Sequence, residues 1–128
     1  MVAKLESNIP KVFKNSYISK GTLNTKMISE NILNFLSEDY VMEKIRFSIK
    51  NEHLELFDRT KKLIRLIELT KELNYIDEMI DYKLELRECL NNLIDLMNDI
   101  APKGTVFSSH VGDGSLLGFW TDKYSTNF

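Results

Sequence analysis

Histidine, aspartate and serine side chains lie close together in a short stretch near the C-terminus of the 128-residue chain. His110 and Asp113 are three residues apart, and Ser108, Ser109 and Ser115 flank them. Imidazole, carboxylate and hydroxyl groups are the side chains from which hydrolytic and metal sites are built. One interpretation is therefore a small metal-dependent hydrolase that uses His110 and Asp113.

The spacing favours a structural interpretation of the same residues. Asp113 lies between two glycines, and Asp-Gly is the preferred pair for a two-residue hairpin turn. Asp113 would then stabilise the turn, and His110 would form a hydrogen bond across the strands. A metal site needs three or four converging ligands, whereas the other histidine, His53, is far away in sequence. Phosphate-binding glycine loops precede a helix and include a lysine, so that alternative is weak too. We therefore predict no catalytic, metal or cofactor site and lean towards a protein without enzymatic activity.

Acidic residues recur through 77–99 and have two interpretations. They are Asp77, Glu78, Asp81, Glu85, Glu88, Asp95 and Asp99. Pairs four residues apart on a helix could bind a divalent cation. More often such a run is a solvated face or faces basic neighbours, here Arg59, Lys62 and Arg65. We favour the second interpretation, and we expect the single cysteine, Cys89, to be an inert, partly buried thiol.

Four aromatic residues fall in the last ten positions: Phe119, Trp120, Tyr124 and Phe128. Aromatic side chains are enriched both at the centres of protein interfaces and in ordinary packing between a hairpin and helices. We expect Trp120 to be the core member of this set. An aromatic tail over 122–128 is hard to bury in a small domain, so these four residues, with His110 and Asp113, form the predicted binding site.

Apolar residues at helical spacing predict four helices that would position these residues, over 26–36, 38–50, 52–73 and 76–100. Thr25, Ser37 and Asn51 are the expected N-caps. In the last helix the predicted core stripe is Ile76, Met79, Ile80, Leu90, Leu93, Ile94, Met97 and Ile100, interrupted by Lys83 and Arg87. The two long helices should pack antiparallel, because the connection between them is short.

The pattern changes to strand-like at both ends of the chain. Residues 12–19 alternate loosely and predict an edge strand or an extended arm. A turn at Asp113-Gly114 would pair Val111 with Leu116, Ser109 with Gly118 and Phe107 with Trp120. The expected fold is mainly α (α+β), a three- to four-helix bundle with an N-terminal extended segment and a C-terminal β-hairpin. We predict a single domain over 1–128, divided into a basic segment 1–24, a helical body 25–101, the hairpin 104–121 and the tail 122–128.

Charge and hydropathy restrict the class of partner. Seventeen basic and nineteen acidic side chains give a net charge of −2, which argues against direct nucleic-acid binding. The first 26 residues hold five lysines and one glutamate, so this segment either lies on the acidic helical body or contacts phosphate groups. The absence of a long apolar run predicts no membrane partner. One cysteine fits a reducing compartment, and we expect a cytoplasmic location.

The stretch Ala101–Trp120 resembles the tails of small uncharacterised proteins of bacteria, phages and mobile elements. The shared pattern is Ala-Pro-x-Gly, an aromatic residue, a histidine, Gly-Asp-Gly and then Gly-aromatic-aromatic. The resemblance implies a setting and no particular activity. With the lack of a convincing catalytic constellation and the aromatic tail, this setting leads us to expect a small non-enzymatic protein-binding module, one that binds and inhibits a host protein complex of defence or nucleic-acid processing. The alternatives are the hydrolase above and a structural homo-oligomer held by the acidic last helix or by the hairpin edge.

Overall fold

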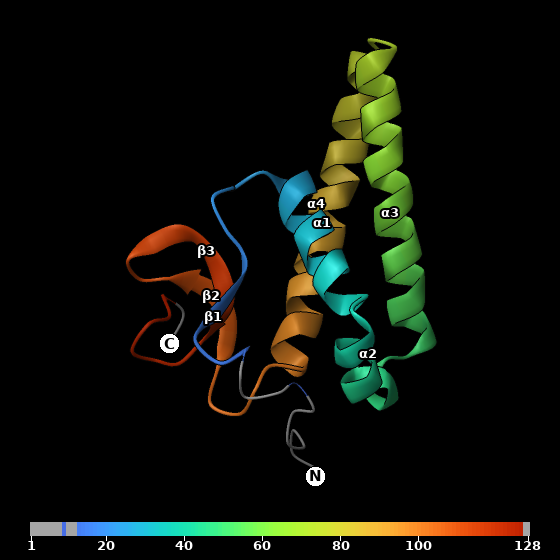
Figure 1. Cartoon of the computed structure of the whole chain (residues 1–128). Helices are drawn as coiled ribbons and strands as arrows, with labels where there is room; N and C mark the ends of the chain where they lie inside the picture. Colours follow the sequence, from blue (N-terminus) through green and yellow to red (C-terminus); the bar gives the residue numbers. More distant parts are fainter. Residues whose placement is uncertain (1–8, 10–12, 127–128) are drawn as a thin grey trace.

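A computed structural model describes residue 9 and residues 13–126 (Figure 1). The elements are β1 (Ser16–Ser19), α1 (Thr25–Leu36), α2 (Asp39–Ile45), the 3-10 turn η2 (Arg46–Ser48), α3 (Asn51–Glu72), α4 (Ile76–Asp99), β2 (Val106–His110) and β3 (Asp113–Trp120). The predicted fold class is confirmed: within the described residues, four helices accompany a three-stranded antiparallel sheet.

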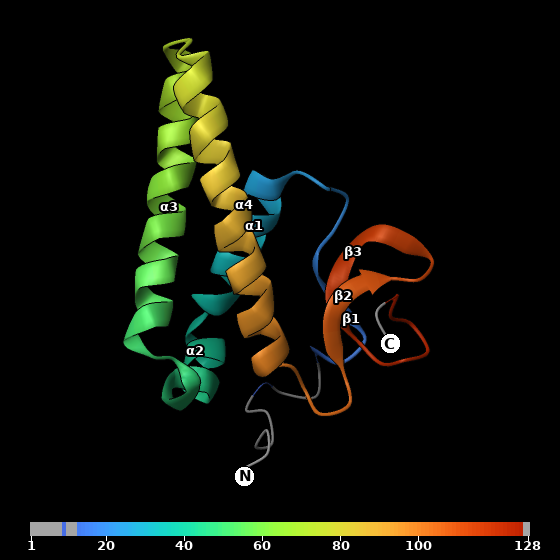
Figure 2. The same ribbon diagram turned by 180° about the vertical axis from the view of Figure 1, so that it is seen from behind.

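The helices α3 and α4 form a long hairpin that stands well beyond the rest of the molecule (Figures 1 and 2). Asn74 permits the tight reversal because it adopts φ +61°, a left-handed conformation that asparagine tolerates better than most residues. The amide of Tyr75 then donates to the Thr70 carbonyl at 2.8 Å and closes the end of α3. The other elements cover the lower part of this hairpin, and the start of α1 reaches as far as Glu68 of α3, whereas the tip of the hairpin extends beyond them (Figure 1).

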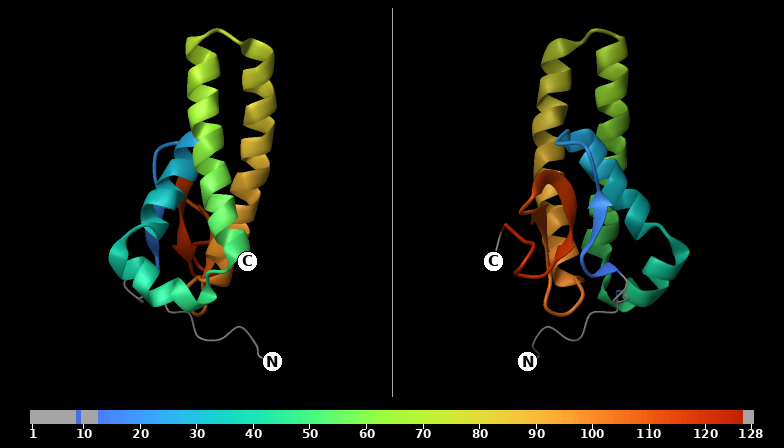
Figure 3. Two further views of the ribbon diagram at one scale, coloured as in Figure 1. Left: turned by 90° about the vertical axis from the view of Figure 1, so that its right-hand side faces the viewer. Right: turned by 60° about the vertical axis from the view of Figure 1, so that its left-hand side comes forward.

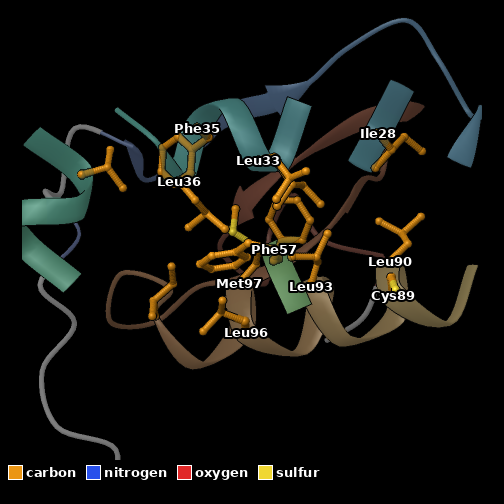
Figure 4. Close-up of a cluster of buried hydrophobic side chains, with 14 of the residues drawn as sticks. Ile28, Leu33, Phe35, Leu36, Phe57, Cys89, Leu90, Leu93, Leu96 and Met97 are labelled. Carbon is orange, nitrogen blue, oxygen red and sulfur yellow. The ribbon is translucent and has the colours of Figure 1, made fainter. Parts of the chain in front are cut away.

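The hydrophobic core lies where α1 crosses the lower part of the helical hairpin (Figure 4). Leu33, Leu36, Leu93 and Met97 point towards one another from α1 and α4 in this view, and Phe57 of α3 closes the cluster. Leu93 and Met97 are fully buried. Cys89 is buried in this core, more deeply than the partly buried position that the sequence predicted.

Helix ends differ from the sequence prediction, most of all for the helix predicted over 38–50, where α2 ends at Ile45 and the 3-10 turn η2 follows. The N-cap of α1 is Asn24 and not Thr25, since the Asn24 side chain accepts a hydrogen bond from the Met27 amide at 3.1 Å. Glu38 precedes α2 and Lys50 precedes α3, where Ser37 and Asn51 were expected. At the start of α3, the Nδ1 atom of His53 accepts the Lys50 amide at 2.9 Å, so this histidine satisfies a helix terminus.

The sheet has the order β1-β3-β2, which makes β3 the central strand (Figure 3, right). The predicted hairpin register is wrong by one residue. Phe107 lies opposite Phe119, Ser108 opposite Gly118, and Val106 opposite Trp120, with the turn at Val111 and Gly112.

The register shift exchanges the two faces of β3, because successive side chains of a strand point to opposite faces. Phe119 enters the core with Phe107, their ring centroids 5.5 Å apart. Trp120 lies on the outer face instead, although it is only 5% exposed. The physical reason for the error is that Asp113 and Gly114 have negative φ and begin β3, so they are not turn residues.

The described part of the N-terminal segment packs on the body through rings and backbone. The Phe13 ring meets the Phe35 ring edge-on at 5.2 Å, and the Asn15 amide donates to the Phe119 carbonyl at 2.7 Å. Just after the segment, Lys26 forms ion pairs with Glu30 and Glu68, as the packed alternative predicts. Residues 1–8 and 10–12 of the predicted basic segment lie outside the described residues.

Candidate functional site

His110 belongs to a small aromatic cluster on the outer face of the sheet. Its ring contacts the Trp120 ring edge-on at 4.9 Å and stacks on the Tyr124 ring at 5.5 Å. The Nδ1 atom of His110 accepts a hydrogen bond from the Gly112 amide at 2.9 Å, which ties the ring to the hairpin turn. Beneath the cluster, the hydroxyls of Ser108 and Ser125 share a hydrogen bond of 2.6 Å. The predicted site residues His110, Trp120 and Tyr124 therefore do meet, in an arrangement that fixes the tail on the sheet.

The Asp113 side chain forms its hydrogen bonds within its own strand, β3. One carboxylate oxygen accepts the amide of Ser115 at 2.9 Å and the hydroxyl of Ser115 at 2.8 Å. These hydrogen bonds, the hydroxyl first, hold the pKa of the Asp113 carboxyl below its usual value of 3.8. Among the residues that the structure describes, no group of three histidine, cysteine or acidic side chains is arranged to hold a metal ion.

The hydrogen bonds of Asp113 predict how its titration changes on mutation. We expect Ser115→Ala to raise the Asp113 pKa towards 3.8, because only the amide hydrogen bond remains. The carboxylate form is the one stabilised, so this contribution to stability is present above pH 3.8 and is lost as the pH falls through the lower folded-state pKa. Carboxyl NMR titration of both proteins measures the shift. An identical Asp113 titration in both proteins would show that the Ser115 hydroxyl bond does not form.

The predicted aromatic binding surface is largely buried. Phe119 is fully buried and is the largest such side chain, so its ring cannot contact a partner directly. Trp120 is nearly buried, as expected of a core member, but it packs on the outer face and not in the main core. Tyr124 is half-buried against His110. Phe128 lies outside the described residues.

The outer edge of β2 is already occupied by the chain itself. The Phe107 amide donates to the Asn98 side chain of α4 at 2.8 Å. Further along, the Val111 amide donates to the Tyr124 carbonyl at 2.8 Å, and the Ser109 carbonyl accepts the Thr126 amide at 3.2 Å. Strand addition needs free backbone groups, so this edge of the hairpin is a poor place for the oligomer contact expected from the sequence.

The acidic residues of α4 have one direct basic partner on α3. Arg59 pairs with Glu85 at 3.4 Å, in agreement with the predicted basic neighbours. Both side chains are about half exposed, so the pair adds at most about 1 kcal/mol to stability. Within the described chain, Lys62 and Arg65 make no ion pair, so only Arg59 of the three predicted basic residues plays that part.

The feature that the sequence prediction missed lies at the far end of the helical hairpin. We call it the distal hairpin surface, and it comprises six exposed large apolar residues, Leu69, Leu73, Tyr75, Ile76, Ile80 and Leu84. Ile76 and Ile80 were predicted as core and are about half exposed; Leu84 is 61% exposed. The error arose because the upper half of α4 extends past α1 and the sheet, which cover only its lower half (Figure 1).

Spacing along α4 shows how its part of this surface is arranged. Ile76, Ile80 and Leu84 are four residues apart and so lie on one helix face. The same face bears Ile94 and, about one turn later, Asn98, which accepts the Phe107 amide where β2 contacts the helix. The apolar stripe thus continues, uncovered, the side of α4 that the sheet covers lower down. The interval of four residues between Ile76, Ile80 and Leu84 was the one signal in the sequence that could have indicated this stripe.

Comparison of the chain with protein-family models, curated proteins and solved structures finds no significant match. The candidate site therefore rests on the geometry described above. Helices within the described ranges are too short or too polar to cross a membrane.

Proposed function

We propose that this protein is a non-enzymatic protein-binding module and that the distal hairpin surface is its binding surface. The observation that carries the proposal is the set of six exposed large apolar side chains at one end of the molecule. Scattered apolar residues are normal on a protein surface, whereas a cluster of them is typical of interaction sites. Aromatic and aliphatic anchors such as Tyr75 and Leu84 supply most of the energy in such interfaces.

The rest of the fold supports a presenting role for the hairpin. The lower halves of α3 and α4 are fixed by the core with α1 and by the sheet, so the upper half is held at a defined angle. Preorganised surfaces bind more tightly because less conformational entropy is lost on association. The hairpin is therefore suited to insert into, or lie along, a groove of a partner.

The finer proposal concerns the setting. A phage or mobile-element factor that binds and inhibits a host defence or nucleic-acid-processing complex in the cytoplasm remains our proposal. Its support is the resemblance of Ala101–Trp120. The His110 and Asp113 geometry gives the hydrolase alternative no added support, since both side chains serve the hairpin.

A homo-oligomer is the second candidate, because an apolar surface can also meet its own copy. In such an oligomer the distal hairpin surface would form the contact. The β2 edge is less suitable, because its backbone groups are already hydrogen-bonded within the chain. Light scattering over a range of protein concentrations separates the two candidates. A monomer at all concentrations would exclude the homo-oligomer, and a dimer that Leu84→Glu dissolves would support it in place of a foreign partner.

The test of the binding surface is affinity capture from a bacterial lysate treated with nuclease. We expect Leu84→Glu to abolish capture of the partner, because a buried unpaired charge at an interface centre costs several kcal/mol. Phe47→Glu is the matched control: Phe47 is exposed, lies in η2 at the opposite end of α3, and places the same charge elsewhere. Capture by Leu84→Glu equal to that by Phe47→Glu would refute the distal surface.

A further inference from the structure

A groove opens beside the distal hairpin surface, between the start of α1 and the two long helices. It has a volume of about 330 Å³. Ile67 of α3 and Leu86 of α4 form its buried apolar floor, and Met27 of α1 lies half-exposed at its side. Figure 3 shows the start of α1 beside the two long helices, which continue beyond it towards their tip.

The rim of the groove is basic although the chain as a whole is slightly acidic. Its charged residues are the cations Lys26, Lys71, Lys83 and Arg87 and one carboxylate, Glu68. Glu68 is already paired with Lys26 at 3.1 Å. Among the described residues, no carboxylate lies within 4.0 Å of the other three cations. Three unpaired cations therefore surround an apolar floor.

The groove and the apolar stripe of α4 form one continuous surface. Lys83 and Arg87 follow Ile76 by seven and eleven residues, which places them on the same helix face as the stripe. Ile76 and Arg87 are eleven residues apart, about 17 Å along the helix axis. An occupant that covers this length and reaches the groove needs roughly three helical turns.

We propose that the groove and stripe bind an acidic amphipathic helix of a partner protein. Its apolar face would cover Ile76, Ile80 and the groove floor, and its carboxylates would face the three unpaired cations. Basic and acidic surfaces that meet in this way set partner choice and speed association. The residues that line the groove include no aromatic side chain for base stacking, and its floor is apolar, so a nucleic acid fits less well. This inference rests on the proposed function and specifies the chemistry of its partner.

The probe is a pair of synthetic helical peptides of about 18 residues, with leucine at positions i, i+3, i+4 and i+7. One peptide has glutamate at the remaining positions, and the other has lysine. Fluorescence anisotropy measures their binding to the full chain. We expect the acidic peptide to bind and the basic peptide not to bind. The double variant Lys83→Glu with Arg87→Glu should weaken acidic-peptide binding by about tenfold or more.

The matched control is Lys61→Glu with Lys62→Glu, which makes the same charge change at exposed positions of α3 outside the groove. Circular dichroism checks that both variants fold. The inference is overturned if the acidic peptide does not bind, or if both variants bind it equally well. It is also overturned if Lys83→Glu with Arg87→Glu instead abolishes binding of a single-stranded DNA oligonucleotide, or dissolves a dimer of the wild-type chain.

The proposed function can survive failure of this inference. If Leu84→Glu abolishes partner capture and the groove variant does not, the distal hairpin surface binds a partner whose charge is not acidic. If Leu84→Glu leaves capture intact, the proposed function fails, whatever the peptides do.

Discussion

We expect Gly118→Ala to lower the free energy of unfolding by roughly 2–3 kcal/mol, because overpacked sites that must move backbone cost that much. A Cβ atom at this position of β3 would overlap the Ser16 carbonyl oxygen and lie 2.8 Å from Cα of Tyr17. Both are backbone atoms of β1, so no side-chain rotation relieves the contact. Glycine is required here because the backbone of β1, which pairs with β3, lies too close to leave room for a side chain. Urea unfolding of wild type and variant measures the difference.

The matched control is Gly114→Ala in the same strand. Nothing lies within 4 Å of a Cβ atom at Gly114, and its φ is not in the left-handed region. We expect the control to leave stability within about 0.5 kcal/mol of wild type, the usual range for surface substitutions. Equal stability of the two variants would mean that β1 does not pair with β3 at Tyr17.

Phe119→Ala is expected to cost about 3–5 kcal/mol of unfolding free energy, the usual cost of removing a buried phenylalanine ring. Phe119 is 0% exposed, and its ring lies between those of Phe35 and Phe107. The same substitution at Phe47, which is 84% exposed and stacks only with the Arg46 guanidinium, should cost less than about 1 kcal/mol. Urea denaturation of the pair provides the test.

The outcome at Phe119 also decides how the aromatic tail is tested for binding. A variant that unfolds the core loses every partner, so loss of binding in Phe119→Ala would not identify a contact residue. If Phe119→Ala and Phe47→Ala proved equally stable, the pairing of Phe107 with Phe119 would be wrong, and Phe119 would be an exposed residue.

The helices were predictable because each buries a periodic face over most of its length. The bounds 52–73 and 76–100 differ from α3 and α4 by one residue at most. The hairpin register was not predictable, since the turn lies two residues earlier than Asp113-Gly114 and an irregularity between Ser109 and His110 then changes the pairing. Two tertiary contacts determine the register. Phe107 and Phe119 pack together in the core, and β1 pairs closely with β3 at Gly118.

The candidate site was predicted only in its structural part. Local sequence predicted that Asp113 and His110 serve the hairpin, but not how: Asp113 bonds to Ser115 within β3 and not in the turn, and His110 accepts the Gly112 amide and not a group across the strands. The exposure of Ile76 and Ile80 could not be predicted from local sequence, because an apolar position on a helix is buried only if another element packs against it. How far α1 and the sheet extend along α4 depends on contacts between distant parts of the chain, which the periodicity of α4 does not contain.

The most direct test of the binding surface compares two variants in one affinity capture, with the captured partner quantified by mass spectrometry. Leu84→Glu alters the distal hairpin surface, and Tyr124→Ala alters the aromatic cluster on the sheet without reaching the core. We predict that Leu84→Glu abolishes capture while Tyr124→Ala retains it. Retention by Leu84→Glu together with loss in a folded Tyr124→Ala variant would contradict the account and place the binding surface on the aromatic tail.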